Sequence, residues 1–178
     1  MSAALYESGL VVLAPPAEPL VKPYRDKHDP AAALGVPAHL TVLYPFHPPS
    51  LPPALSARLA ALFAELEPFD YALTELRRFP GVLYLAPRPE APFRLLTRRV
   101  AAAFPDFPPY GGRFDDIIPH LTLAQQDDPG RLDQVAAHFL AACGPRLPLR
   151  LRAESVALLD NERGAWRVCA TFPLGARV

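Results

Sequence analysis

One short segment occurs twice in this chain, and its duplication constrains the fold more than any other feature. Pro-Ala-His-Leu-Thr-Val-Leu at residues 37–43 is matched by Ile-Pro-His-Leu-Thr-Leu-Ala at residues 118–124. The two histidines, His39 and His120, are 81 residues apart, which is close to half of the 178-residue chain. This spacing predicts two structurally similar halves related by a pseudo-twofold axis.

Prolines are the second constraint, because 24 of them divide the chain into short elements. Ser50 is expected to cap a helix that ends near Leu66. The expected strands are 10–14, 39–46, 69–79, 82–86, 119–124, 147–159 and 166–172, and the expected helices are 50–66, 91–104 and 131–142, with a helical or irregular stretch at 17–34. Each half therefore has a His-Leu-Thr strand, then a helix, then a hairpin of two strands.

We predict from this order an α+β fold with two antiparallel sheets flanked by helices around a central cleft. The chain is long enough to bury a hydrophobic core in one domain. We expect a single bilobal domain of residues 1–178. Its lobes are built around segments 39–90 and 120–178, and segments 1–38 and 91–119 complete them.

The duplicated segment carries chemical groups that alternate along a strand. Residues two positions apart on a strand point to the same face. His39 and Thr41 therefore project together, while Leu40 faces the opposite side, and His120 and Thr122 repeat the pattern. If the two strands meet across the twofold axis, two imidazoles and two hydroxyls converge on one cleft.

This group of side chains suits phosphoryl transfer without a metal ion. Imidazole titrates near neutral pH, so one histidine could take a proton from an attacking water while the other gives one to a leaving ribose oxygen. Threonine hydroxyls can donate hydrogen bonds to the non-bridging phosphoryl oxygens. The alternative is that both histidines are structural and are only bonded to the nearby backbone.

Composition narrows the classes of partner. Eighteen basic residues balance eighteen acidic ones, so there is no charged footprint for long nucleic acid, and a nucleotide or a short RNA end is the expected substrate. Two cysteines are too few for a disulfide framework, and no apolar stretch reaches membrane-spanning length. We expect a cytoplasmic monomer with no cofactor, no metal, no membrane association and no obligate protein partner.

The two motifs resemble those of the two-histidine (2H) phosphoesterase superfamily, whose hallmark is two H-x-[T/S] motifs in a bilobal fold. This superfamily includes the 2′-5′ RNA ligase-like proteins and the RNA 2′,3′-cyclic phosphodiesterases. The resemblance also covers the hairpin at 79–85 and the terminal strand with Trp166. One departure is Gln125, because the better-known cyclic phosphodiesterases often have arginine at this point after the second motif.

The resemblance implies a pseudo-twofold 2H phosphoesterase fold in which His39 and His120 are catalytic and Thr41 and Thr122 bind phosphate. It implies hydrolysis of a 2′,3′-cyclic phosphate, or of a related 2′-linked phosphodiester, with 2′-5′ RNA ligation as the minor reverse activity. Two alternatives remain open: a non-catalytic nucleotide- or RNA-binding module, and a metal-dependent hydrolase that uses the same histidines.

Four further residues are candidate substrate contacts. Tyr84 lies between two leucines, so its ring is expected to face the cleft and stack on a base. Phe46 could form a wall of the site, Arg113 could meet an anionic substrate from a glycine-rich loop, and Arg152 could contact phosphate. For each of them the alternative is an ordinary structural role, in the core or on a solvated surface.

Overall fold

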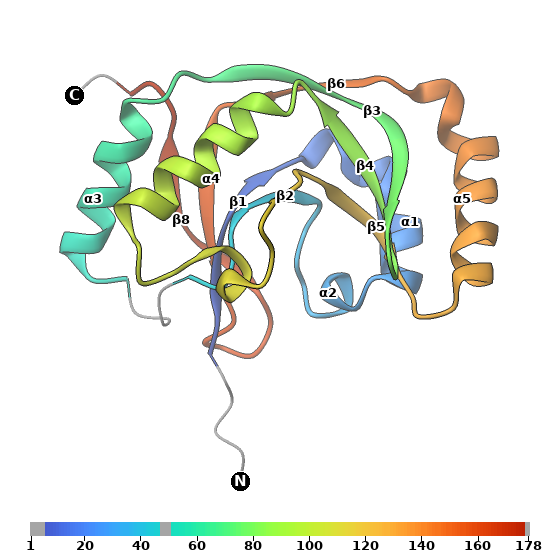
Figure 1. The fold of residues 1–178 in the computed structure, drawn as a ribbon, viewed down its shortest axis with the longest axis horizontal. Helices are drawn as coiled ribbons and strands as arrows, with labels where there is room; N and C mark the ends of the chain where they lie inside the picture. Colours follow the sequence, from blue (N-terminus) through green and yellow to red (C-terminus); the bar gives the residue numbers. More distant parts are fainter. Residues whose placement is uncertain (1–5, 47–50, 177–178) are drawn as a thin grey trace, which may run out of the picture.

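The computed structural model describes residues 6–46 and 51–176. Two four-stranded antiparallel sheets are flanked by helices, as the sequence predicts (Figure 1). Sheet A has the strand order β2-β1-β7-β8, and sheet B has the order β5-β4-β3-β6. The strands are β1 (Ser8–Leu13), β2 (His39–Leu43), β3 (Phe69–Phe79), β4 (Val82–Arg88), β5 (Leu121–Gln125), β6 (Leu149–Ala153), β7 (Ser155–Asp160) and β8 (Arg167–Pro173). The helices are α1 (Glu18–His28), α2 (Pro30–Ala33), α3 (Pro53–Ala64), α4 (Ala91–Ala103) and α5 (Pro129–Cys143), with short 3-10 turns η1 (Pro15–Ala17), η2 (Pro109–Gly112) and η3 (Gly144–Arg146).

The same order of elements occurs twice, and the two copies exchange helices. The order β1-α1-β2-α3 in the first half is repeated by β4-α4-β5-α5 in the second. Helix α1 contacts β5, and helix α4 contacts β2. Each half therefore covers the His-Leu-Thr strand of the other half, which ties the two motifs to a common core.

The predicted strand over residues 147–159 is wrong, because this segment forms two strands in different sheets. Strand β6 pairs with β3 in sheet B, whereas β7 pairs with β1 and β8 in sheet A. Buried positions alternate up to Ala153 and become continuous from Val156 onward, and the chain passes between the sheets at Glu154. Both sheets consequently draw strands from both halves of the chain.

The remaining boundaries differ in smaller ways. The stretch predicted as helical or irregular is split at Asp29, whose side chain caps α2 by accepting a hydrogen bond from the Ala31 amide. Helix α3 begins after Pro52 rather than Ser50, and Ser50 lies outside the described residues. His120 directly precedes the first residue of β5, and His39 is the first residue of β2, so both histidines lie at the start of their strands.

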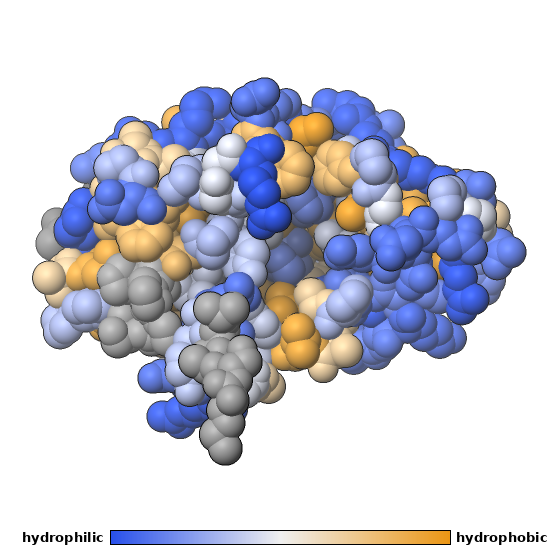
Figure 2. Space-filling view, turned by 60° about the horizontal axis from the view of Figure 1, so that its bottom comes forward, coloured by the Kyte–Doolittle hydropathy of each residue, from blue (hydrophilic) through white to orange (hydrophobic). Residues whose placement is uncertain are grey.

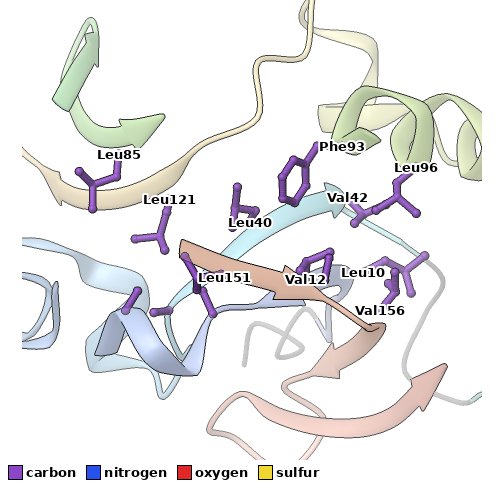
Figure 3. Packing of buried hydrophobic residues seen from close by; sticks show 14 of the residues in the cluster. Leu10, Val12, Leu40, Val42, Leu85, Phe93, Leu96, Leu121, Leu151 and Val156 are labelled. Atoms are coloured by element: carbon purple, nitrogen blue, oxygen red, sulfur yellow. The ribbon is translucent and has the colours of Figure 1, made fainter. Parts of the chain in front are cut away.

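Alternation along β2 and β5 places the leucines of the two motifs in the main hydrophobic core. Leu40 and Leu121 are both fully buried. Figure 3 shows Leu40 and Val42 of β2 facing α4, on the side where Phe93 and Leu96 project from that helix. The neighbouring polar side chains must then point to the opposite faces of the sheets.

Truncation of Leu40 tests the position of this core. We expect Leu40→Ala to lower the free energy of unfolding by about 3 kcal/mol, because it removes buried methyl groups and leaves a cavity. Urea denaturation measures the change. The control is Leu95→Ala on α4, where the side chain is 42% exposed; equal destabilisation by the two substitutions would contradict the assignment of Leu40 to the core.

Candidate active site

The fold brings the two His-Leu-Thr motifs together. Strands β2 and β5 are in contact although they belong to different sheets. His39, Thr41, His120 and Thr122 are half-buried on the faces opposite to the buried leucines. The charge of His120 also acts on the pKa of His39, which requires the two imidazoles to be near each other.

Both histidines are fixed by the same hydrogen bond to the backbone two residues earlier. His39 Nδ1 lies 2.7 Å from the Pro37 carbonyl oxygen, and His120 Nδ1 lies 2.7 Å from the Ile118 carbonyl oxygen. A carbonyl oxygen only accepts, so each Nδ1 must carry the hydrogen and donate it. Each neutral ring then keeps its lone pair on Nε2, where it can take a proton.

The site holds both rings in their neutral form. Desolvation by burial lowers the pKa of His39 to about 4, against the opposing effect of the hydrogen bond to Pro37. The charges of Arg25 and His120 lower this pKa further, and Asp29 raises it. Burial also lowers the pKa of His120, and its bond to the backbone again opposes the shift. At neutral pH both imidazoles are therefore available as bases.

Two stacked aromatic rings line the His120 side of the site. The rings of Phe79 and Tyr84 are 4.3 Å apart and nearly parallel. The His120 ring is 5.2 Å from Phe79 and 5.6 Å from Tyr84, so it lies beside the stack rather than on top of it. Tyr84 is also the cross-strand neighbour of Thr122 and is only 3% exposed. Phe79 is the less buried ring of the pair.

A second aromatic group lines the His39 side. Burial raises the pKa of the Tyr110 phenol, and the neighbouring hydroxyl of Thr41 lowers it, so the two hydroxyls lie side by side. The Tyr110 amide donates to the Tyr44 carbonyl at 2.6 Å, and the two rings meet edge to face with centroids 6.4 Å apart. Trp166 lies 6.2 Å from the Tyr44 ring. This half of the site is therefore rich in tyrosine hydroxyls and aromatic surface.

These aromatic side chains rest on an apolar floor that is separate from the main core. Val11 pairs directly with Thr41, so both point to the same face of sheet A. Val11 forms a small buried cluster with Ala157 and Leu159, against which Trp166 packs. A Cβ at Gly9 would come within 3.3 Å of the Tyr44 ring, so the absence of a side chain there allows Tyr44 its close approach to the sheet.

Sequence reasoning missed Tyr110 and Phe79 as members of the site. Tyr110 lies in η2, in the glycine-rich loop before the second motif, and takes the left-handed conformation with φ of 51°. Gly111 and Gly112, which follow it, are the sequence feature that could have indicated this, because consecutive glycines allow a sharp bend. Such a bend can turn a neighbouring side chain back toward the sheets. Nothing in the alternation of β3 distinguished Phe79 from a core residue.

The other candidate contacts lie farther from the two histidines. Phe46 is 5% exposed and packs against Phe104 and Phe107, so the structure assigns it to the core. Arg152 lies on β6, and β5 lies at the opposite edge of sheet B. Three strand spacings separate β6 from β5, which places the two strands about 14 Å apart. Arg152 pairs with Asp70 at 3.0 Å.

Arg113 is exposed at the rim and donates from Nε to the Tyr110 carbonyl at 3.2 Å. Arg113 therefore contacts the loop that carries Tyr110, whereas Phe46 lies in the core and Arg152 lies at the far edge of sheet B. Figure 2 shows that the face turned forward is hollowed near its middle, with apolar residues above and below the hollow and hydrophilic residues mainly to its right.

Neither a candidate metal centre nor a membrane-spanning helix is found in the described residues. Across residues 6–46 and 51–176, no group of three or more histidine, cysteine or acidic side chains is arranged to hold a metal ion. In the same part of the chain, every helix is too short or too polar to cross a membrane.

Comparison with known families agrees with this geometry. The sequence profile of the 2′-5′ RNA ligase superfamily matches residues 13–165, which is most of the chain. The chain belongs to the 2′-5′ RNA ligase superfamily. The resemblance to 2H phosphoesterases that the two motifs indicate is thereby confirmed.

Solved structures show how the superfamily fold is shared. TT0787 of Thermus thermophilus is 20% identical with a TM-score of 0.59, and the match covers 97% of this chain and 100% of that one. Escherichia coli LigT in complex with 3′-AMP is 18% identical with a TM-score of 0.57, and the match covers 94% of this chain and 97% of that one. No curated protein sequence is significantly similar to the chain.

Titration of the two rings tests the electrostatics of the site. We expect His39 to stay neutral down to about pH 4 and His120 to titrate below the usual value of about 6.5, because burial disfavours both imidazolium ions. The unfolded chain binds these protons at about pH 6.5, so the stability of the fold should fall as the pH drops from there toward 4. Long-range proton–nitrogen NMR of the rings measures the pKa values, and the variants His39→Gln and His120→Gln assign the signals. Titration of both rings at or above pH 6.5 would contradict the burial.

Proposed function

We propose that this superfamily member is a metal-independent phosphodiesterase that opens 2′,3′-cyclic phosphates, or cleaves related 2′-linked phosphodiesters, of nucleotides or short RNA. The observation that carries the proposal is the shared state of the two neighbouring histidines. Each is held by its Nδ1 hydrogen on a backbone carbonyl and keeps Nε2 for proton transfer. Two imidazoles held in this way can supply one base and one acid to a single phosphate.

In the proposed reaction, one Nε2 takes a proton from water while the water oxygen forms a bond to phosphorus. The bond between phosphorus and one ribose oxygen breaks, and the second histidine gives its proton to that oxygen. The product is a phosphomonoester with a free ribose hydroxyl. Exchange with solvent returns each ring to its starting protonation state, so the cycle consumes one water and no cofactor.

The lowered pKa of His39 favours this ring as the base and leaves the role of the acid to His120. The pKa of His39 is lowered to about 4, so this ring remains neutral and can accept a proton. Burial also lowers the pKa of His120. A bound phosphodiester anion favours the imidazolium form of a neighbouring ring, and in this proposal His120 gains that proton on binding.

Hydroxyl groups support the phosphate in this proposal. Thr41 and Thr122 share their strand faces with the two histidines, where they can donate hydrogen bonds to the non-bridging oxygens. The hydroxyl of Tyr110 lies beside that of Thr41 and can orient it. Such donors stabilise the transition state most when they are already in place before charge develops on the phosphate.

Aromatic surface beside His120 supports a nucleotide as the substrate. We assign the base-stacking role to Phe79 rather than Tyr84, since Tyr84 is buried beneath it. E. coli LigT has been solved with 3′-AMP, with ATP and with NADP+, all of which are nucleotides. The same site would also catalyse the reverse of 2′-5′ bond cleavage as a minor activity. In that reaction a 5′-hydroxyl of RNA attacks the cyclic phosphate in place of water, the bond from phosphorus to the 3′ oxygen breaks, and that oxygen takes up a proton as the 2′-5′ bond forms.

Substitution of the histidines tests the enzyme directly. We expect His39→Gln and His120→Gln each to reduce hydrolysis of nucleoside 2′,3′-cyclic phosphates by about 10²- to 10⁴-fold, because each removes one proton-transfer group. Thr41→Val and Thr122→Val should reduce it less. The matched control is His138→Gln, which changes an exposed histidine on α5.

The assay is run in EDTA to separate the possible outcomes. Full activity in EDTA supports the metal-independent reaction, whereas loss of activity in EDTA would indicate a metal-dependent hydrolase. Nucleotide binding without turnover would indicate a non-catalytic module. Undiminished activity in either histidine variant would rule out the acid–base pair.

The pH profile gives a second test. We expect kcat/KM to be bell-shaped and to lie on the acid side of neutrality, because both pKa values of the free enzyme are lowered. The rate should fall below about pH 4 as His39 becomes protonated, and it should fall toward neutral pH as His120 loses its proton. A profile that is flat from pH 4 to pH 8 would contradict catalysis by this pair.

A further inference from the structure

Two arginines donate hydrogen bonds to backbone carbonyls just before the two motif histidines. The carbonyls that they bind occupy equivalent positions in the two halves of the chain. Arg25 on α1 donates from Nη2 to the Val36 carbonyl at 3.0 Å. Arg94 on α4 donates from Nη1 to the Ile117 carbonyl at 3.1 Å. Val36 and Ile117 each lie three residues before a motif histidine, directly before the residue whose carbonyl accepts the Nδ1 hydrogen.

Each arginine is itself anchored by acidic side chains. Arg25 pairs with Asp29 at 2.9 Å, and both side chains are 3% exposed. Arg94 pairs with Glu90 one turn earlier at 3.2 Å and with Asp116, which neighbours the carbonyl that it holds. A planar guanidinium can serve a carboxylate and a carbonyl in fixed directions at the same time, which an ammonium group does less well.

The two arginines come from the two helices that are exchanged between the halves of the fold. Helix α1 packs against β5 but uses Arg25 to hold the loop leading into β2. Helix α4 packs against β2 but uses Arg94 to hold the loop leading into β5. Each helix thus contacts the motif strand of one half and the motif loop of the other.

We propose that Arg25 and Arg94 are positioning residues, each of which fixes the tautomer and orientation of one histidine by clamping the peptide carbonyl before its Nδ1 acceptor. With the clamp in place the acceptor carbonyl cannot turn away, and the imidazole keeps its hydrogen on Nδ1. The proposal rests on the proposed acid–base function for its effect on rate. Its effect on the rings exists without any reaction.

A clamp of this kind acts on one ring at a time, and this separates it from a general contribution to stability. Loss of Arg94 should disturb His120 and leave His39 unchanged. Loss of the guanidinium group of Arg25 should disturb His39 and leave His120 unchanged. A residue with only a structural role would affect both rings or neither.

The test compares Arg94→Met with Arg98→Met, which removes an exposed arginine one turn later on the same helix. Long-range proton–nitrogen NMR of the free protein reads the tautomer of each ring. We expect His120 to change from a single Nδ1–H form to a mixture of tautomers in Arg94→Met, with His39 unaltered, and we expect no change of either ring in Arg98→Met.

Kinetics of cyclic phosphate hydrolysis give the second readout. Arg94→Met should lower kcat by about 10- to 100-fold with little change in KM, because the substrate still binds while one proton-transfer group is misdirected. Arg94→Lys should restore part of the rate, since an ammonium group can still reach an acidic partner or the carbonyl.

Arg25 is tested by Arg25→Lys, which retains a positive charge beside buried Asp29, because complete removal of one partner of a buried pair destabilises a fold strongly. Here the His39 signals should show the mixture of tautomers. If Arg25→Lys does not fold, the Arg94 series decides the question alone. Retention of the single His120 tautomer in Arg94→Met would overturn the proposal, and an inactive wild-type protein with the expected NMR changes would overturn the proposed function but not the clamp.

Discussion

The alternation of side chains along β2 and β5 is the constraint on which the rest of the structure depends. One face of each strand carries Leu40 or Leu121 into the hydrophobic core, and the other face carries a histidine and a threonine. The large burial of the leucines fixes the register of both strands. A slip of one residue would bury the imidazoles and expose the leucines, so the energetics of the core also determine the placement of the chemistry.

Desolvation links this placement to reactivity. The same packing that positions the rings removes water from them and lowers their affinity for protons. The backbone carbonyls of Pro37 and Ile118 then serve as fixed acceptors that choose which nitrogen is free. In the proposed reaction, the orientation of these two neutral rings and the binding of a phosphodiester anion supply the difference between base and acid.

The sequence predicts the local elements and the two motifs well, because both depend on short-range patterns. The hairpin of β3 and β4, helix α4 and helix α5 follow from turn residues and from helical spacing. The pairing of β6 with β3 could not be read in this way, since it depends on contacts far apart in the chain. Tyr110 and Arg94 enter the site environment through tertiary contacts, which leave no periodic signal in the sequence.

The interleaving of the sheets has a consequence for how the protein is made. Strand β1 needs β7 as a neighbour before sheet A is more than a two-stranded ribbon, and such a ribbon is barely stable by itself. Strand β7 leaves the ribosome more than 100 residues after β2. His39 is therefore synthesised long before its surroundings exist. Neither half of the chain contains a complete sheet, and a truncated product that ends before β7 would carry both motifs without the strand that joins β1 to β8 in sheet A.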